Sequence, residues 1–573
     1  MKKRNILLLI PCLLFSFSCS SNSLVSKTES KKEEMFDIAA DLLKVNYRPN
    51  IYNSPLQLDF EYNKEMYDLY YSFDSNHLDS LSHYFKYDGE GINVYEDKLK
   101  SKTDYPCTTS VDAILSYDFE GKCVSNNYIN NIQKPNSYKF KSKLNTLNVV
   151  LKDKKSDEIK LKKTLTYLIE NNATSIYKIP IVSINIPYED MFNPYNGFYN
   201  NIRDDISSRC SLEIIDPYYN EYTNLNSSIK LGGNWTLGYP LRTLNLNFNK
   251  DENGNKNTPV TNHLFKDRNA ISSSKTLTNF TRLRVHSGGN AFEESIGFND
   301  ALLQGLMVGT KASTAACRPV LSYINGEYWG LTFLREHYKT NYVEQNYGIK
   351  KSKVVMFDLK GELLFDDGDE EEIANEKLNT LNDYIKNKDL SIDDNYNDFV
   401  NNVIDVESLI DVVLAQAYAS NWDFIGNFNN LKAFASTTID TKNPYQDGKI
   451  RFCLHDADFA FRDTNNVLDI NHNNFYGKYP LLNSLMKNSN FRSKLLSRAK
   501  ELISTNLSYE NAMNVMNGFI NDIKDYKVVS QIRWGATNDY STLWNNELNY
   551  VKTNIRNKQN KFISEVTNFV NYY

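Results

Sequence analysis

The 573-residue sequence predicts an α+β fold in which a small β-sandwich precedes a mixed, mostly antiparallel sheet and then a helical region. Three observations predict it: alternating apolar runs up to about residue 171, an Asn-Gly hairpin signal further along, and helical periodicity after about residue 358. Alternation with a period of two is typical of strands, whereas apolar residues three or four apart are typical of helices. Because 41% of the residues are hydrophobic and 13% aromatic, the chain can bury large cores, which excludes wholesale disorder.

The N-terminus predicts export and lipid attachment. A basic start, 1–4, is followed by an apolar run, 6–17, of 12 residues, which is shorter than the about 20 residues that a membrane-spanning helix needs. The run ends in small residues and Cys19, which resembles a bacterial lipoprotein signal, and a plain secretory signal is the alternative. We expect residues 1–18 to be removed, Cys19 to carry a lipid and 19–47 to form a tether. The chain would then lie in the cell envelope, anchored to a membrane, either periplasmic or surface-exposed.

Composition and charge exclude several classes of protein. The chain has 65 basic and 70 acidic residues and a net charge of -5, so no strongly basic face that would bind nucleic acid is expected. Seven cysteines in this length are too few for a disulfide scaffold. Cys107 and Cys123 could close a short loop, but isolated thiols explain them equally well. We expect a monomer without a nucleic-acid partner.

Residues 48–171 predict the β-sandwich, which we expect to act as a structural spacer. Short alternating runs with turn residues between them are typical of such sandwiches. The segment also resembles the chitobiase C-terminal-like modules of bacterial surface proteins. The alternating runs are 56–60, 67–71 and 147–151, and the pieces that carry the resemblance are 52–55, 70–74 and 164–167.

The next part of the chain predicts a sheet with a helix inserted in it. Residues 181–186 form a continuous apolar run that is typical of a buried strand, 241–248 alternates, and 298–307 has helical spacing. The clearest local signal is Asn325-Gly326, which stands between two β-rich runs. Both residues of a type I′ turn need positive φ, which Asn and Gly tolerate, so this dipeptide predicts a hairpin.

The C-terminal part predicts helices interrupted by one hairpin. Residues 406–420 form a strongly apolar helical segment, and 484–525 and 537–570 are amphipathic. Between them, 431–434 and 450–454 bracket a polar loop in the way that two paired strands do.

Two segments concentrate short polar side chains next to apolar elements: 421–430 after the apolar helix, and 455–461 after the second hairpin strand. A carboxylate after a buried helix, then an amide, then a carboxylate ending a hairpin strand is a kinase-like order. Phosphoryl transfer needs one acid to orient the acceptor hydroxyl, and an amide and a second acid to hold Mg²⁺. Asp-x-Asp also occurs in metal-dependent glycosyltransferases and at calcium sites, and many Asp/Asn clusters are turns.

From about residue 180 to 570 the chain resembles the CotH kinase family, whose members have an atypical kinase-like fold. The resemblance implies that 179–573 is a two-lobed protein-kinase-like domain, with a mixed antiparallel sheet lobe and a helical lobe. The matching motifs are 181–183 with 193–199, 287–290 with 298–302, 324–330 continuing to 334–336, then 421–423, 429–430, 455–458 and 533–534.

The resemblance implies a role for each polar residue of the two segments. Asp423 would be the catalytic acid that orients the acceptor hydroxyl or takes its proton. Asn430 would be the metal-holding amide, with Asn427 as the competing choice. Asp456 would be the principal Mg²⁺ ligand, supported by Asp458.

The residues that would contact the nucleotide are less clearly indicated by the sequence than the metal-binding residues. Arg242 stands where the family commonly has Lys, Arg284 is a further candidate for the phosphates, and Glu336 would pair with a basic residue near them. Gly232-Gly233 is the nearest approach to a phosphate-covering loop, because its backbone N–H groups could face phosphates, although Gly-Gly is equally a turn.

Two functions therefore remain open. The first is an ATP- and Mg²⁺-dependent protein kinase, with Mn²⁺ as an alternative metal, which transfers the γ-phosphate to exposed Ser or Thr residues of exported proteins. The second is a catalytically weak or inactive surface lipoprotein that serves in binding, adhesion or structure. The intact set Asp423, Asn430 and Asp456 favours the first, and an extracytoplasmic location, where ATP is scarce, favours the second.

Overall fold

The computed structural model describes most of the chain from residue 35 onward. The predicted signal, Cys19, Cys107 and Asn427 lie outside the described residues. None of the described helices is both long and apolar enough to cross a membrane. The described residues are 35–74, 80–96, 116–117, 123–124, 143–202, 204–249, 260, 262–361, 364, 371–426, 430–469, 480–534 and 540–573.

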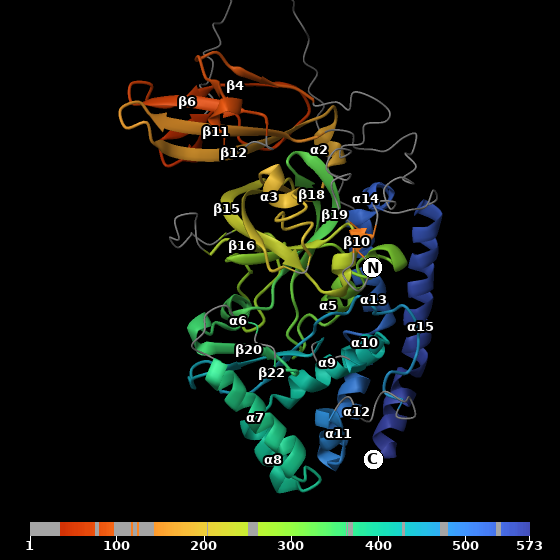
Figure 1. Cartoon of the computed structure of the whole chain (residues 1–573). Coiled ribbons are helices and arrows are strands. Elements are labelled where there is room, and N and C mark those ends of the chain that lie inside the picture. The colour runs from red at the N-terminus through yellow and green to blue at the C-terminus, as the bar shows by residue number, and fades with distance from the viewer. Residues whose placement is uncertain are drawn as a thin grey trace, which may run out of the picture.

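The architecture is mixed α+β: small N-terminal sheets, a closed barrel of seven strands, and a C-terminal helical region (Figure 1). In Figure 1 the N-terminal sheets lie above the barrel and most of the helices lie below it, while the long helix α15 (Tyr540–Tyr572) runs along one side. The α+β class predicted from the sequence is confirmed, and the sheet at its centre closes on itself.

The N-terminal sheets surround one hydrophobic cluster. This module begins at Phe36, earlier than the predicted start at residue 48, because Leu43 and Val45 are fully buried in the cluster. Residues 36–45 therefore belong to the sheets and not to a tether. The strands are β1 (Phe36–Ala39), β2 (Leu43–Val45), β3 (Ile51–Tyr52), β4 (Leu56–Leu58), β5 (Phe60–Glu61), β6 (Tyr67–Ser72), β7 (Phe85–Lys86), β8 (Ile92–Val94), β11 (Asn145–Asp153) and β12 (Ile159–Ile169). The short strands β9 (Ser116–Tyr117) and β10 (Cys123–Val124) form a separate two-stranded sheet, and β10 lies level with the barrel in Figure 1.

The module packs directly on the barrel. The Thr166 N–H on β12 donates to Glu213 Oε1 at 2.9 Å, and Asn224 Nδ2 donates to the Thr164 carbonyl at 2.6 Å. Ile51 and Leu168, on two strands of the module, are buried in the same hydrophobic cluster as the barrel strands. The two parts are therefore joined by polar and apolar contacts.

The barrel has the strand order β13-β14-β15-β16-β17-β19-β18. Neighbours pair antiparallel, except that β13 pairs parallel with β18 and so closes the ring. The predicted hairpin is confirmed between β18 and β19, where Asn325 and Gly326 both have positive φ. The strands are β13 (Ile181–Asn185), β14 (Ser207–Asp216), β15 (Glu221–Gly232), β16 (Thr243–Asn247), β17 (Arg282–His286), β18 (Cys317–Ile324) and β19 (Glu327–Glu336).

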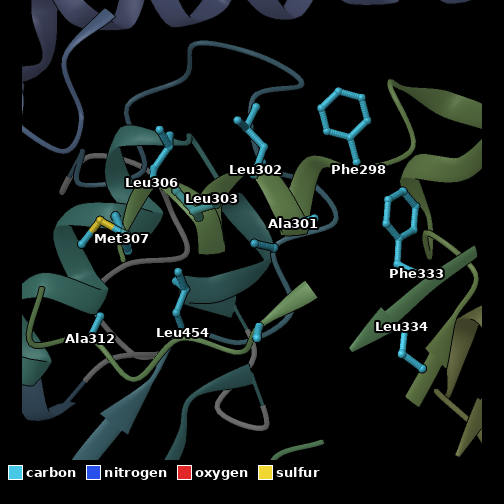
Figure 2. Close-up of a cluster of buried hydrophobic side chains, with 14 of the residues drawn as sticks. Phe298, Ala301, Leu302, Leu303, Leu306, Met307, Ala312, Phe333, Leu334 and Leu454 are labelled. Atoms are coloured by element: carbon cyan, nitrogen blue, oxygen red, sulfur yellow. The ribbon is translucent and has the colours of Figure 1, made fainter. Parts of the chain in front are cut away.

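The helix predicted at 298–307 is α5 (Asn299–Leu306), which enters between β17 and β18. Its buried Leu302, Leu303 and Leu306 belong to one cluster with Leu454, which follows a strand of the helical region (Figure 2). Phe333 of β19 lies in the same cluster. This packing fixes the barrel against the helical region next to the polar residues 455–458.

The helical region contains one further sheet, in which β21 pairs antiparallel with both β20 and β22. The predicted apolar helix is α9 and the predicted hairpin is β21–β22, so both are confirmed. The elements are α6 (Thr340–Tyr347), β20 (Val354–Asp358), α7 (Glu371–Asn387), α8 (Asp393–Asn402), α9 (Val406–Tyr418), α10 (Trp422–Gly426), β21 (Lys432–Ser436), β22 (Arg451–Cys453), α11 (Pro480–Met486), α12 (Ser489–Ser504), α13 (Tyr509–Ile523), α14 (Lys527–Trp534) and α15. Shorter helices are α2 (Ala173–Ile176), α3 (Tyr188–Phe192) and α4 (Ala291–Glu294).

Candidate active site

The β21–β22 hairpin brings the two polar segments together. Lys432, which begins β21, pairs with Cys453, which ends β22. Residues just before β21 and just after β22 therefore lie at the same end of the hairpin. Asn430 stands at the first position, and its Nδ2 donates to Asp423 Oδ2 at 2.8 Å. Asp456 stands at the second, and Asp423 acts on it electrostatically. The structure thus brings Asp423, Asn430 and Asp456 together at one end of the hairpin.

The backbone at Asp456 has a conformation that side chains rarely adopt, with φ of 54°. A residue held there costs about 1–3 kcal/mol, so its surroundings must fix it. Two buried amides do this: Asn421 Nδ2 donates to the Asp456 carbonyl at 3.0 Å, and Gln416 Nε2 donates to the His455 carbonyl at 3.1 Å. Gln416 Oε1 also accepts from Asn421 Nδ2 at 2.8 Å. The amides aim the Asp456 carboxylate by holding its main chain.

Asp458 is bound from the barrel side. The Asn290 N–H donates to Asp458 Oδ2 at 3.3 Å. This approach requires glycine at residue 289, because a Cβ there would lie 1.6 Å from Asp458 Oδ2, and φ at Gly289 is 59°. The loop that the sequence matched as a family motif is therefore the element that receives Asp458.

The carboxylates of the site repel one another. Burial, then Asp423 and Asp300, raise the pKa of Asp456 to about 6. Burial and the neighbouring Asp456 raise the pKa of Asp458 well above its ordinary value. Each shift means that a negative charge there is disfavoured unless a cation lies close by.

The donor set fits Mg²⁺ bound together with phosphates. Mg²⁺ takes oxygen ligands, and it is usually held by one or two carboxylates plus phosphate oxygens and water. Asp456, Asp458 and the Asn430 amide supply oxygen atoms of this kind. In the described part of the chain no three His, Cys, Asp or Glu side chains are grouped closely enough to hold a metal ion by themselves. A metal ion held by these residues would take its remaining ligands from phosphate oxygens and water.

A buried ion pair lies close to Asp456 and Asp458. Asp300, in the first turn of α5, contacts Arg335 of β19 at 2.6 Å, and both side chains are almost fully buried. Asp300 Oδ1 also accepts from the Ala457 N–H at 3.1 Å. Since Ala457 lies between Asp456 and Asp458, this bond positions both carboxylates. The sequence did not single out Asp300 or Arg335.

Arg284 of β17 is the cation that faces the acids. It pairs in register with Asn245 of β16 and Arg335 of β19. Its Nε donates to Asn245 Oδ1 at 2.9 Å, and its Nη2 lies 3.3 Å from His337 Nε2. Burial, then Arg335, lower the pKa of Arg284 to about 10, while Asp456, Asp300 and Asp458 act in the opposite direction. In the part of the chain that the structure describes, no carboxylate lies within ion-pair distance of its guanidinium.

Two other candidates for the nucleotide site have structural contacts. Arg242 is only 1% exposed; it donates to the carbonyls of Leu237 and Tyr199 and lies over the Tyr199 ring. Its guanidinium is therefore not available to a phosphate in this arrangement. Glu336 is also buried, and its oxygens accept from the Ala316 N–H and from Asn346 Nδ2, each at 2.8 Å. The expected pairing of Glu336 with a basic residue is replaced by these two bonds.

The Gly232-Gly233 pair ends β15 next to Asn245. A Cβ on Gly232 would lie 2.7 Å from both the Nδ2 and the Oδ1 of Asn245. Glycine thus makes room for the amide that holds Arg284. The proposed contact of this pair with phosphates stays a prediction.

The positioning residues that sequence reasoning missed are Gln416, Asp300, Asn245 and His337. One signal was present for Gln416, because it is a fully buried polar residue in an otherwise apolar stretch of α9. Asn245 and His337 gave no comparable signal, since their importance depends on which strands are neighbours.

Comparison with known proteins agrees with this geometry. A sequence model described as CotH kinase protein matches residues 263–561, more than half of the chain. The match includes Arg284, Asp423, Asn430 and Asp456 and begins inside the barrel, after β16. No curated protein matches the chain.

Proposed function

Because this chain belongs to the CotH kinase protein family, we propose that it is an atypical, two-lobed protein kinase that transfers the γ-phosphate of ATP to Ser or Thr residues of exported proteins. Membership of the family implies a kinase and the use of ATP. The observation that carries the proposal is the meeting of Asp423, Asn430 and Asp456 at one end of the β21–β22 hairpin. Protein kinases place a catalytic acid, a metal-binding amide and a metal-binding acid in the same chain order.

Each of these residues has a role in the proposed reaction. Asp423 orients the acceptor hydroxyl and accepts its proton, since a carboxylate held by the Asn430 amide beside Asp456 is placed to act as a general base. Asp456, Asp458 and Asn430 are the residues that would hold Mg²⁺, or Mn²⁺ in its place. When bound, the metal ion neutralises the charge on the phosphates.

Arg284 is the proposed phosphate contact. A guanidinium binds phosphate oxygens through two parallel N–H groups, so its orientation matters. Asn245 and His337 hold the guanidinium from the barrel side. Arg284 therefore points its charge toward the acids without being neutralised by any one of them.

The proposed location follows from the N-terminus. We infer that Cys19 carries a lipid and that the segment before Phe36 tethers the protein to a membrane of the cell envelope. The acceptor proteins would then be exported proteins that reach the same compartment.

The test is phosphoryl transfer by the purified chain. Incubation with γ-labelled ATP and Mg²⁺ should label the protein or an added acceptor, and Asp423→Asn should lower the rate about a hundredfold or more, as loss of a general base does. Asp394→Asn is the matched control, because Asp394 is an exposed acid on α8 that takes no part in the site. Equal labelling by the Asp423→Asn variant would contradict the assignment. Absence of both nucleotide binding and labelling, with either metal, would favour the inactive surface lipoprotein.

A further inference from the structure

We propose that an open groove next to the strand that carries Arg284 docks an acidic, extended segment of the acceptor protein; this inference rests on the proposed kinase function. The groove has a volume of about 880 Å³ and lies between the barrel, α6 and the β21–β22 connection. It is called the acceptor groove below. Its lining comes from residues within 270–281, 341–351 and 442–445, together with Asn249.

The acceptor groove and the active site share structural elements. Thr281 lines the groove and precedes Arg284 by three residues, which is roughly 10 Å along a strand. Asn341 lines it too and follows His337, the residue that contacts Arg284, by four positions. The Asn341 Nδ2 donates to Thr281 Oγ1 at 2.7 Å, which ties these two lining residues together. The groove therefore adjoins the strand that carries Arg284, while its side at 442–445 lies at the opposite end of the β21–β22 hairpin from Asp456.

The charge of the groove predicts the charge of its occupant. Three lysines line it from three separate segments: Lys275, Lys351 and Lys442. Among the described residues, none of their ammonium groups makes an ion pair. The single acid of the lining, Glu344, accepts a bond from the Lys351 backbone N–H at 3.4 Å. Excess positive charge at one groove of a chain with a net charge of -5 indicates an acidic ligand.

The rest of the lining suits an extended polypeptide. Hydroxyl and amide side chains from 272–281 and 341–345 offer donors and acceptors for a peptide backbone. Tyr347 and Tyr445 pack edge to face with their ring centroids 5.1 Å apart, and both line the groove. Such a pair offers an apolar contact for one side chain of the occupant.

The nucleoside of ATP is the competing occupant, and the lysines argue against it. A base and its ribose carry no charge, and the phosphates have Arg284 as a proposed partner, together with the metal ion that the acids would hold. Three lysines would add nothing to the recognition of the uncharged half of a nucleotide. An acidic peptide uses all three.

The test is charge reversal in the full-length chain. The triple variant Lys275→Glu, Lys351→Glu, Lys442→Glu is compared with a control triple on exposed helical positions, Lys386→Glu, Lys494→Glu, Lys500→Glu. The probe is a fluorescein-labelled peptide of Asp and Glu with one central Ser, and its binding is followed by fluorescence anisotropy without ATP. The groove variant should bind about tenfold more weakly or worse, since each exposed ion pair contributes up to about 1 kcal/mol. The control triple should bind like the unchanged chain.

Three results would overturn the inference. They are equal affinity for an acidic peptide and its Asn/Gln counterpart, equal binding by the groove variant and the control triple, and a raised KM for ATP in the groove variant, which would assign the groove to the nucleotide. Thermal unfolding of both triple variants shows whether they are folded. Because the binding assay needs no ATP, a chain that binds the acidic peptide but transfers no phosphate would contradict the proposed function and leave the groove assignment standing.

Discussion

The Asp300–Arg335 pair and the Asp456–Asp458 cluster lie at the same junction of barrel and helical region, yet their charges are arranged differently. Asp300 and Arg335 are both almost fully buried and contact each other at 2.6 Å. Asp456 and Asp458 have no such partner, and their pKa values are raised by burial and by neighbouring acids. The first arrangement is electrostatically complete within the chain. The second leaves negative charge that a bound cation would balance.

The same contrast separates the two arginines that the sequence proposed for phosphate. Arg242 is buried against the Tyr199 ring, and its guanidinium donates to two backbone carbonyls. Arg284 is half-buried, held by two neutral side chains, and surrounded by acids that it does not contact. Groups whose charge is satisfied inside the chain stabilise the fold, whereas groups whose charge is left open are available to a ligand.

The largest expected effect on stability comes from breaking the closed pair. Asp300→Asn should lower the free energy of unfolding by about 3–5 kcal/mol, because it leaves the Arg335 guanidinium buried without its carboxylate. Urea denaturation measures this. Asp456→Asn is the matched variant, since the chemical change is the same at an open carboxylate. It should leave stability unchanged or raise it, because it removes a repelling charge. Equal losses of unfolding free energy in the two variants would show that the paired Asp300 and the unpaired Asp456 do not differ in the way proposed here.

Substitution of Arg242 should lower stability, whereas substitution of Arg284 should mainly weaken nucleotide binding. Both losses of stability should be smaller than that of Asp300→Asn. Arg242→Met leaves two buried carbonyls without a donor, which should cost about 2–4 kcal/mol of unfolding free energy. Arg284→Met should cost less unfolding free energy than Arg242→Met, because it leaves two side chains and no buried backbone carbonyl without a donor, while raising the KM for ATP. Parallel urea unfolding and steady-state kinetics measure both quantities. The assignment fails if Arg242→Met raises the KM for ATP and Arg284→Met does not.

A third prediction concerns a buried acid, Glu213, whose pKa is raised by burial even though Lys163 acts in the opposite direction. Glu213 lies where the N-terminal sheets meet the barrel, and burial raises its pKa to about 7. Because the folded pKa lies above the ordinary value of 4.5, the contribution of Glu213 to stability is fully present below pH 4.5 and is lost as the pH rises through 7. Ionisation at pH 8 should therefore cost up to about 3 kcal/mol.

Glu213→Gln tests this prediction. Glutamine keeps the acceptor for the Thr166 N–H and the Tyr222 hydroxyl, and its amide nitrogen can donate to Thr166 Oγ1. The variant should be more stable than the unchanged chain at pH 8, with little difference at pH 5. Thermal unfolding at the two pH values measures it. A variant that is less stable at both would indicate that Glu213 is ionised and stabilising in the fold.

Much of the local structure was predictable because it depends on neighbouring residues. The Asn325-Gly326 turn, the apolar helix α9 and the hairpin β21–β22 all follow from spacing and turn chemistry. The order of Asp423, Asn430 and Asp456 was predictable for the same reason. This order can be read directly from the sequence.

What could not be predicted depends on contacts between distant segments. The barrel closes through a parallel pair, Ile181 with Leu321, whose members lie far apart in sequence. Arg242 and Arg284 carry the same side chain on neighbouring strands, and only their surroundings separate them. The need for glycine at 289 becomes visible only once Asp458 stands beside it.

The measurement that tests the central claim most directly is calorimetric binding of ATP, with and without Mg²⁺, by the unchanged chain and by Asp456→Asn. If the Asp456 and Asp458 carboxylates form a metal–nucleotide site, the unchanged chain binds ATP in the presence of Mg²⁺. It binds ATP much more weakly when EDTA removes the metal. The Asp456→Asn variant should lose this dependence on Mg²⁺ while unfolding at the same urea concentration or higher. Equal, Mg²⁺-dependent binding of ATP by both proteins would contradict the account.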